Sequence, residues 1–194
     1  MIFKNKLTEL YVNKKMSMQE IADRLGCSLH KVKYWMEKHE IKIRSRSDAT
    51  YIKRNPDGDP FKLVMPKNFE EAKLFGLGLG LYWGEGTKAN KNSIRLGNTD
   101  PGVIINFMKF LIKFFSIKKE DLKFGLQIFS DVNPQVALDF WIEKLKVNNS
   151  QFNRPIITKS GSVGTYHKKN LYGVLTVMYH NKKSRDALIN LLPM

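Results

Sequence analysis

The stretch LFGLGLGLYWGEGTK, Leu74–Lys88, is apolar and rich in glycine, and its one acidic side chain, Glu85, lies where the apolar run stops. Gly76, Gly80 and Gly84 recur every four residues, so in a helix they lie near one face. Each interior glycine costs a helix about 1 kcal/mol relative to alanine, so the spacing favours a face that another backbone approaches closely. A carboxylate at the C-terminal end of a helix is disfavoured by the helix dipole and is better explained by a neighbouring cation.

The balance of charges points to a polyanionic partner. The 194 residues include 33 Lys and Arg against 18 Asp and Glu, for a net charge of +15. Nucleic acid is the commonest polyanion, and the alternative is a basic protein without such a partner. One cysteine, Cys27, excludes a disulfide framework and a thiolate metal site. The apolar runs are too short or too interrupted by lysine for a membrane span, so we expect a soluble, cytoplasmic, nucleoid-associated protein.

The first 54 residues are typical of a small helical DNA-binding domain. Ser17 is placed to cap one helix, with Glu20 at the spacing of a capping box, and Gly26 ends that helix. Ser28 caps the next helix after a short turn, which predicts a helix-turn-helix, as in bacterial regulators and recombinases. A plain three-helix bundle is the alternative. The outer face of the last helix supplies the candidate DNA contacts, which are His30, Lys31, Lys33 and Tyr34.

A polar segment ends this domain, and a proline-rich joint follows it. Arg44 and Arg46 are expected to be exposed, either in a solvated linker or in an arm that contacts phosphates or the minor groove. Residues 55–67 contain three prolines and a glycine, which forbid a continuous helix and predict a linker. The second domain is then expected at residues 68–194.

The second domain is predicted to be α+β, with a curved antiparallel sheet and helices on one face. Helices are expected at 69–85, 101–115, 133–147 and 181–192, and strands at 93–98, 121–129, 152–159 and 171–180. The helix at 133–147 is inserted between strands, which leaves the order of the sheet open. Arg95, Lys123 and Gln127 alternate with apolar residues, so they belong to an open, polar face. Such a face can lie in a DNA groove or simply face solvent.

The stretch GLGLYWGEG at Gly78–Gly86 resembles the motif of the LAGLIDADG homing endonucleases. Gly80 and Gly84 match the small positions, and Glu85 followed by glycine matches the acid and its glycine. The segment SIRLGNTDPGVIINFMKFL, residues 93–111, continues like the strand, turn and next helix of that family. The resemblance covers residues 69 to 194 and implies site-specific cleavage of double-stranded DNA.

The chain carries one copy of this motif, which is similar to the single-motif members that form homodimers and cut near-palindromic sites. The resemblance implies that two motif helices pack side by side and that Glu85 is the catalytic residue, with one Glu85 from each subunit holding Mg²⁺ or Mn²⁺. It places four residues of the motif helix at the dimer interface, which are Gly76, Gly80, Leu81 and Gly84. Gly86 is expected to end the helix in a left-handed conformation.

Two features leave the function open at this point. Trp83 occupies a position that is often acidic in the family, and accessory active-site residues do not transfer with the motif, so Lys88, Gln127, Lys168 and Lys169 are candidates only. Some domains of this kind serve in transcription control, so a DNA-binding regulator that does not cleave is the alternative. Glu85 favours the nuclease, because a protein that only binds DNA has no need of an acid beside phosphates.

Overall fold

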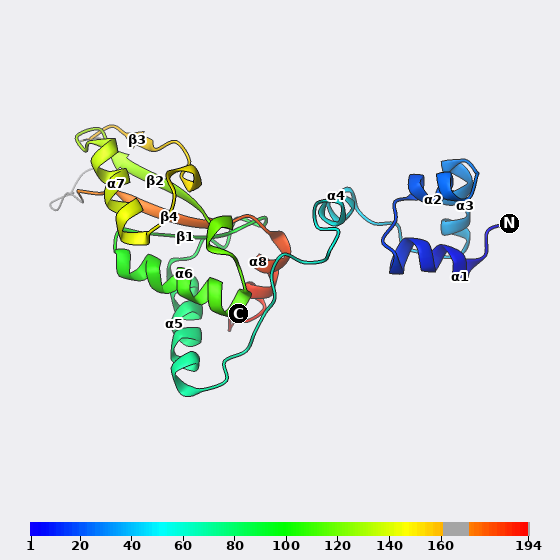
Figure 1. Cartoon of the computed structure of the whole chain (residues 1–194), viewed down its shortest axis with the longest axis horizontal. Coiled ribbons are helices and arrows are strands. Elements are labelled where there is room, and N and C mark those ends of the chain that lie inside the picture. Colours follow the sequence, from blue (N-terminus) through cyan, green and yellow to red (C-terminus); the bar gives the residue numbers. More distant parts are fainter. Residues whose placement is uncertain (161–170, 194) are drawn as a thin grey trace. The chain divides into compact units, whose positions relative to one another are not determined.

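The structure of the chain is a computed structural model that describes residues 1–160 and 171–193. It is an α+β protein with two compact units. Helices form the first unit, Met1–Pro60, and a four-stranded mixed sheet with helices packed on it forms the second, Phe61–Met194. Eight α-helices occur in the described ranges (Figure 1). The boundary at Pro60 falls inside the predicted linker, and residues beyond it already belong to the second unit, since the Lys62 and Val64 amides donate to the Phe115 and Phe114 carbonyls.

The first unit folds around short helices with side-chain caps. They are α1 (Lys4–Leu7), the π-helical turn η1 (Thr8–Asn13), α2 (Met18–Arg24) and α3 (Leu29–Lys38). The predicted capping box is present, because the Glu20 amide donates to Ser17 Oγ at 3.2 Å and the Ser17 amide to the Glu20 carboxylate at 2.6 Å. These bonds to Ser17 lower the pKa of Glu20. The core of this unit includes Leu7, Leu10, Ile21, Val32 and Met36.

A further helix, α4 (Arg46–Arg54), was missing from the sequence prediction. Ser45 caps it, since its hydroxyl accepts a hydrogen bond from the Asp48 amide at 3.1 Å and donates one to the Asp48 carboxylate at 2.7 Å. None of its residues is buried. The helix therefore lacks the apolar stripe by which the other helices were recognised, and only its cap could have revealed it.

The second unit alternates helices and strands. Its elements are α5 (Phe69–Glu85), β1 (Ile94–Asn98), α6 (Pro101–Phe115), the 3-10 turn η2 (Lys119–Asp121), β2 (Lys123–Phe129), α7 (Pro134–Leu145), the 3-10 turn η3 (Asn149–Gln151), β3 (Ile156–Thr158), β4 (Val174–Tyr179) and α8 (Lys182–Ile189). The sequence predicted α5 and α6 with the bounds that the structure gives. Asn68 caps α5 and Asp100 caps α6, each through its side-chain oxygen.

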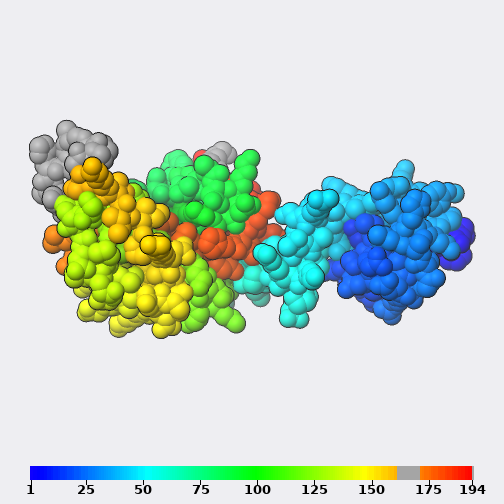
Figure 2. Space-filling model, turned by 90° about the horizontal axis from the view of Figure 1, so that it is seen from above, coloured from blue at the N-terminus to red at the C-terminus, as the bar shows by residue number. Residues whose placement is uncertain are grey.

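The sheet has the order β1-β4-β2-β3, in which β4 is antiparallel to both of its neighbours. The edge strand β3 is parallel to β2, so the prediction of a wholly antiparallel sheet was wrong. The cause is α7, which connects β2 to β3 as a crossover helix and returns the chain in the same direction. The part of the chain around β3, yellow to orange, lies at the surface of its unit (Figure 2).

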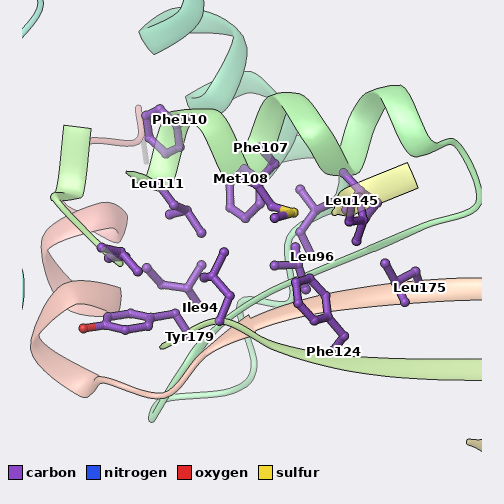
Figure 3. Packing of buried hydrophobic residues seen from close by; sticks show 14 of the residues in the cluster. Ile94, Leu96, Phe107, Met108, Phe110, Leu111, Phe124, Leu145, Leu175 and Tyr179 are labelled. Carbon is purple, nitrogen blue, oxygen red and sulfur yellow. The ribbon is translucent and has the colours of Figure 1, made fainter. Parts of the chain in front are cut away.

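The main core lies between one face of the sheet and the helices. Figure 3 shows Phe107, Met108 and Leu111 of α6 directed at Ile94 and Leu96 of β1, with side chains of the other strands beside them. The predicted alternation is confirmed, because Phe124, Leu126 and Ile128 are buried while Lys123, Gly125 and Gln127 on the same strand are half-buried or exposed. The sheet thus offers one apolar face to the helices and one polar face outward.

Candidate nucleic-acid interface

The glycine stripe of α5 faces away from the core of its own chain. Gly76, Gly80 and Gly84 are exposed, and a Cβ built on any of them would meet no heavy atom within 4 Å. Three large apolar side chains of the same helix are also exposed, which are Phe69 at 74%, Leu77 at 45% and Trp83 at 54%. Leu81, the fourth predicted interface residue, is partly buried against the core. One helix therefore presents a face of glycines and large apolar side chains that stays largely exposed within its own chain.

A different glycine makes the close contact inside the chain. Gly78 is buried against α6, and a Cβ there would lie only 2.1 Å from Cγ of Phe110. Gly78 lies outside the predicted stripe of Gly76, Gly80 and Gly84, and its close contact was not predicted. Helical geometry separates them, because a residue two positions from Gly76 or Gly80 points to the opposite side of the helix. The two glycine faces of α5 thus have different neighbours.

Glu85 is the last residue of α5, and its side chain is exposed. Within the described part of the chain it makes no hydrogen bond or ion pair. Gly86 is extended, with φ −72° and ψ 142°, so the expected left-handed end was wrong. Gly86 instead forms a β-bridge with Leu96, and a Cβ at Gly86 would lie 2.3 Å from the Tyr82 ring. The chain therefore passes directly from Glu85 to the edge of β1.

Lys88 lies at the same end of α5. Its ammonium group donates to the carbonyl oxygen of Trp83, in the last turn of the helix. A cation here compensates the partial negative charge of the helix C-terminus. Lys88 of the same chain is therefore one cation at this end of the helix, where the sequence predicted one. It does not bind Glu85, so both carboxylate oxygens of Glu85 remain open to a ligand.

The open face of the sheet is built from cross-strand rows of residues. Arg95, Met178 and Lys123 form one row, Gly97, Thr176 and Gly125 the next, and Val174, Gln127 and Ile156 the third. Among the described strand residues on this face none is acidic. The first row is basic, the second is low because glycines flank a threonine, and the third combines an amide with two β-branched side chains.

The basic row is held in place by neutral oxygens. Arg95 Nε donates to Ser93 Oγ at 2.9 Å, and Lys123 Nζ donates to the Ser150 carbonyl at 3.4 Å. Burial lowers the pKa of His180, which follows β4, and the charges of Arg95 and Lys123 lower it further. The three side chains therefore share a positive region, although the sequence analysis had left His180 without a role.

Gln127 carries an oriented amide on the third row. Its Nε2 donates to Thr158 Oγ1 at 3.3 Å, which uses one of its two N–H groups. The other N–H group and the carbonyl oxygen are the pair that recognises the N7 and N6 groups of adenine. Ile156, next to it, is 63% exposed and offers an apolar surface of the kind that contacts a thymine methyl group.

The outer face of α3 is as predicted in the first unit. His30, Lys31, Lys33 and Tyr34 are exposed, and Ser28 caps the helix through the Lys31 amide at 3.2 Å. Arg46 is exposed at the start of α4. The unit therefore presents a basic helix face.

Arg44 is half-buried, so the expectation that it is exposed was wrong. Its guanidinium donates to the carbonyls of Lys15 and Met16, each at 2.9 Å, and to that of Tyr11. It also lies 3.9 Å from the centre of the Tyr11 ring. These contacts give Arg44 a structural place within the first unit.

The remaining observations concern two predicted lysines, metal clusters, membrane spans and similarity to known proteins. Lys168 and Lys169 lie outside the described residues. In the described part of the chain, no three or more His, Cys, Asp or Glu side chains converge where they could hold a metal ion. Likewise, none of the described helices is long and apolar enough to cross a membrane. No family model, curated protein or solved structure matches this chain.

Proposed function

We propose that this protein is a homodimeric, metal-dependent, site-specific endonuclease of double-stranded DNA. It would be of the single-motif LAGLIDADG kind, with an added helix-turn-helix unit. The observation that carries the proposal is the outward glycine stripe of α5, which ends at the exposed and unpartnered Glu85. Direct continuation from Glu85 to the edge of β1 connects this acid to a sheet with a basic open face.

A second copy of the chain is the partner that best fits the stripe. Glycines at four-residue spacing let two helices approach backbone to backbone, and Phe69, Leu77 and Trp83 would be covered beside them. One motif per chain then implies a twofold axis that passes between two copies of α5. The same axis brings the two Glu85 carboxylates toward each other.

Double-stranded DNA is the ligand that suits the charge and shape of the open face. Arg95 and Lys123 would contact phosphates, while Gln127 would read an adenine edge in the major groove. The low row of Gly97, Thr176 and Gly125 would let the duplex approach closely. Twofold symmetry of the dimer predicts a near-palindromic site. The basic face of α3 in the first unit adds contacts of its own.

The metal chemistry is supported by the donor type and by the freedom of Glu85. A hard carboxylate oxygen suits Mg²⁺, and Mn²⁺ accepts the same ligands. Since Glu85 makes no other hydrogen bond or ion pair in the described structure, one Glu85 from each subunit would hold the metal, together with phosphate oxygens of the DNA. A metal held there would supply Lewis-acid activation of a water molecule and stabilisation of the leaving 3′ oxygen.

The chain's own residues provide position and charge for this reaction. Glu85 would hold the cation beside the reacting phosphate, and its place in the last turn of α5 limits the movement of its backbone. Lys88, bound to the last turn of α5, adds positive charge near the phosphate, where negative charge increases during the reaction. Arg95 and Lys123 hold the flanking backbone against the sheet.

The proposal is tested by selecting duplexes from a randomised DNA pool with the full-length protein. We expect a near-palindromic consensus, two chains per duplex and strand breaks within the site when Mg²⁺ or Mn²⁺ is added. Binding should weaken steeply with salt, because each neutralised phosphate contributes about −0.9 to the slope of log K against log salt. A duplex that is bound tightly and never cut with either metal would replace the nuclease by the alternative, a DNA-binding regulator.

A further inference from the structure

Arg185 of α8 holds the loop that follows Glu85, although the two lie far apart in sequence. Its side chain is only 15% exposed. One terminal nitrogen donates to the backbone carbonyl of Lys88 at 2.7 Å, across 97 positions of the chain. The other donates to the Asp186 carboxylate at 3.1 Å. A nearly enclosed guanidinium is thus anchored on one residue of the loop between α5 and β1.

The same loop is fixed at three further points. The Gly86 amide donates to the Tyr82 carbonyl and the Thr87 amide to the Arg95 carbonyl, each at 2.9 Å. The Lys88 ammonium donates to the Trp83 carbonyl. Arg185 therefore holds the backbone of Lys88 while the side chain of Lys88 holds the end of α5. Removing Arg185 would free the residue that links the loop to the helix end.

Stability alone gives a poor account of this arrangement. Arg185 Nε and the Tyr82 hydroxyl are both buried and neither makes a hydrogen bond of good geometry, although the two side chains lie close enough that Arg185 offsets part of the rise that burial causes in the pKa of Tyr82. Tyr82 lies one helical turn before Glu85 and is fully buried, with its ring stacked on Phe107. Burying a charged group costs free energy, and polar atoms left without a good hydrogen bond add to that cost. Such a cost is often met where a geometry must be kept fixed for function.

We propose that Arg185 is a positioning residue for DNA cleavage. It keeps Lys88 and the last turn of α5 in one orientation, so that Glu85 and the Lys88 ammonium face the reacting phosphate together. This inference rests on the proposed function, since it assigns Arg185 a part in the same site. It predicts that Arg185 affects the rate of cleavage much more than the affinity for DNA, because none of its hydrogen bonds is directed at the open face.

The first test needs no DNA and measures amide hydrogen exchange in the full-length protein. In Arg185→Met, the Gly86 and Thr87 amides should exchange roughly tenfold faster or more, since their opening no longer requires the release of Arg185. Arg185→Lys keeps the charge and one donor, so it should lie between Met and the native protein. Lys183→Met, an exposed position on the same helix, removes the same charge and should leave both amides unchanged.

The second test measures single-turnover cleavage of a selected duplex at saturating protein. Arg185→Met should slow cleavage by about 10- to 100-fold, the range expected for a misplaced reacting group, with the dissociation constant within about twofold of native. Arg185→Lys should recover part of the rate, and Lys183→Met should cut at the native rate. If Arg185→Met does not fold, the Arg185→Lys protein carries both measurements.

The results separate this inference from the function on which it rests. Exchange that stays native in both Arg185 variants overturns the inference, and so does faster exchange with an unchanged cleavage rate. A native protein that binds duplex without cutting it overturns the proposed function instead. In that case amide exchange alone decides whether Arg185 holds the loop. Native exchange rates of the Gly86 and Thr87 amides in both Arg185→Lys and Arg185→Met would reject that role too.

Discussion

Replacing Gly80 with alanine separates the properties of one chain from those of the proposed dimer. A Cβ at Gly80 meets nothing within 4 Å in its own chain, so the added methyl group has room there. Alanine is also the better helix former, which should stabilise the isolated chain by about 0.5–1 kcal/mol. In a dimer that packs α5 against its twin, the same methyl group would lie between the two backbones and push them apart.

The size of the effect on the dimer follows from the twofold symmetry. An extra methyl group in a packed interface costs about 1–3 kcal/mol, and the symmetry axis introduces two of them. A loss of about 2 kcal/mol is the low end, which raises the dissociation constant of the dimer roughly 30-fold. The gain in helix propensity is present in monomer and dimer alike, so it cancels from this constant. Gly80→Leu should separate the subunits entirely and abolish cleavage.

Sedimentation equilibrium measures the dissociation constant of the dimer. Urea unfolding at low protein concentration measures the free energy of unfolding of the single chain. The matched control is Gly78→Ala, whose Cβ would lie 2.1 Å from Phe110. This control should destabilise the chain by about 1–3 kcal/mol at every protein concentration, because the overlap is within one chain. Dimerisation through α5 is rejected if the native protein is a monomer even with DNA. It is also rejected if Gly80→Ala stabilises the chain and dimerises as tightly as the native protein.

Three further predictions concern the first unit and the open face of the sheet. Removing Met1 to Arg54 should weaken DNA binding and relax its specificity while the second unit stays folded, and equal affinity and selectivity in a gel shift would reject the helix-turn-helix assignment. Arg44→Met should lower the unfolding free energy of the first unit by about 1–3 kcal/mol, since the carbonyls of Tyr11, Lys15 and Met16 lose a charged donor, whereas a change in sequence preference without loss of stability would contradict this. The pKa of His180 should rise when DNA binds, because phosphates offset the charges of Arg95 and Lys123, so affinity should increase as the pH falls through that pKa. An NMR titration of His180 that is the same with and without DNA would exclude DNA from this face.

Local signals in the sequence were enough for much of the fold. Apolar runs were enough to locate α5 and α6, whose starts Asn68 and Asp100 cap in the structure, and the alternation along β2 identified both faces of the sheet. The parallel edge strand could not be predicted, because the direction of β3 depends on how α7 crosses the sheet and not on any residue within β3. A hydrophobic pattern gives the faces of a strand and says nothing of its neighbour.

The candidate site was predicted in part for the same reason. The glycine stripe and Glu85 are local features of one helix and were visible in the sequence. Arg185 and His180 come near the site only through the return of the chain at its C-terminal end, so no spacing in the sequence could assign them. Arg44 was expected to be exposed from its polar neighbours, whereas its contacts with Tyr11 and the adjacent carbonyls are long-range.

We propose that Glu85 holds the metal needed for DNA cleavage. Comparing cleavage by the native protein and by two glutamine variants tests this proposal. Native protein, Glu85→Gln and Glu70→Gln are incubated with the selected duplex and Mg²⁺, and a gel shift is run beside the cleavage assay. Glu70 is an exposed acid at the other end of the same helix, so its variant controls for the loss of one charge.

Glu85→Gln should bind at least as tightly as native, since two negative charges leave the DNA face of the dimer, and should show no cleavage. Glu70→Gln should cut at the native rate. If Glu85→Gln cuts as fast as the native protein, Glu85 has only a structural role and the endonuclease site lies elsewhere or does not exist.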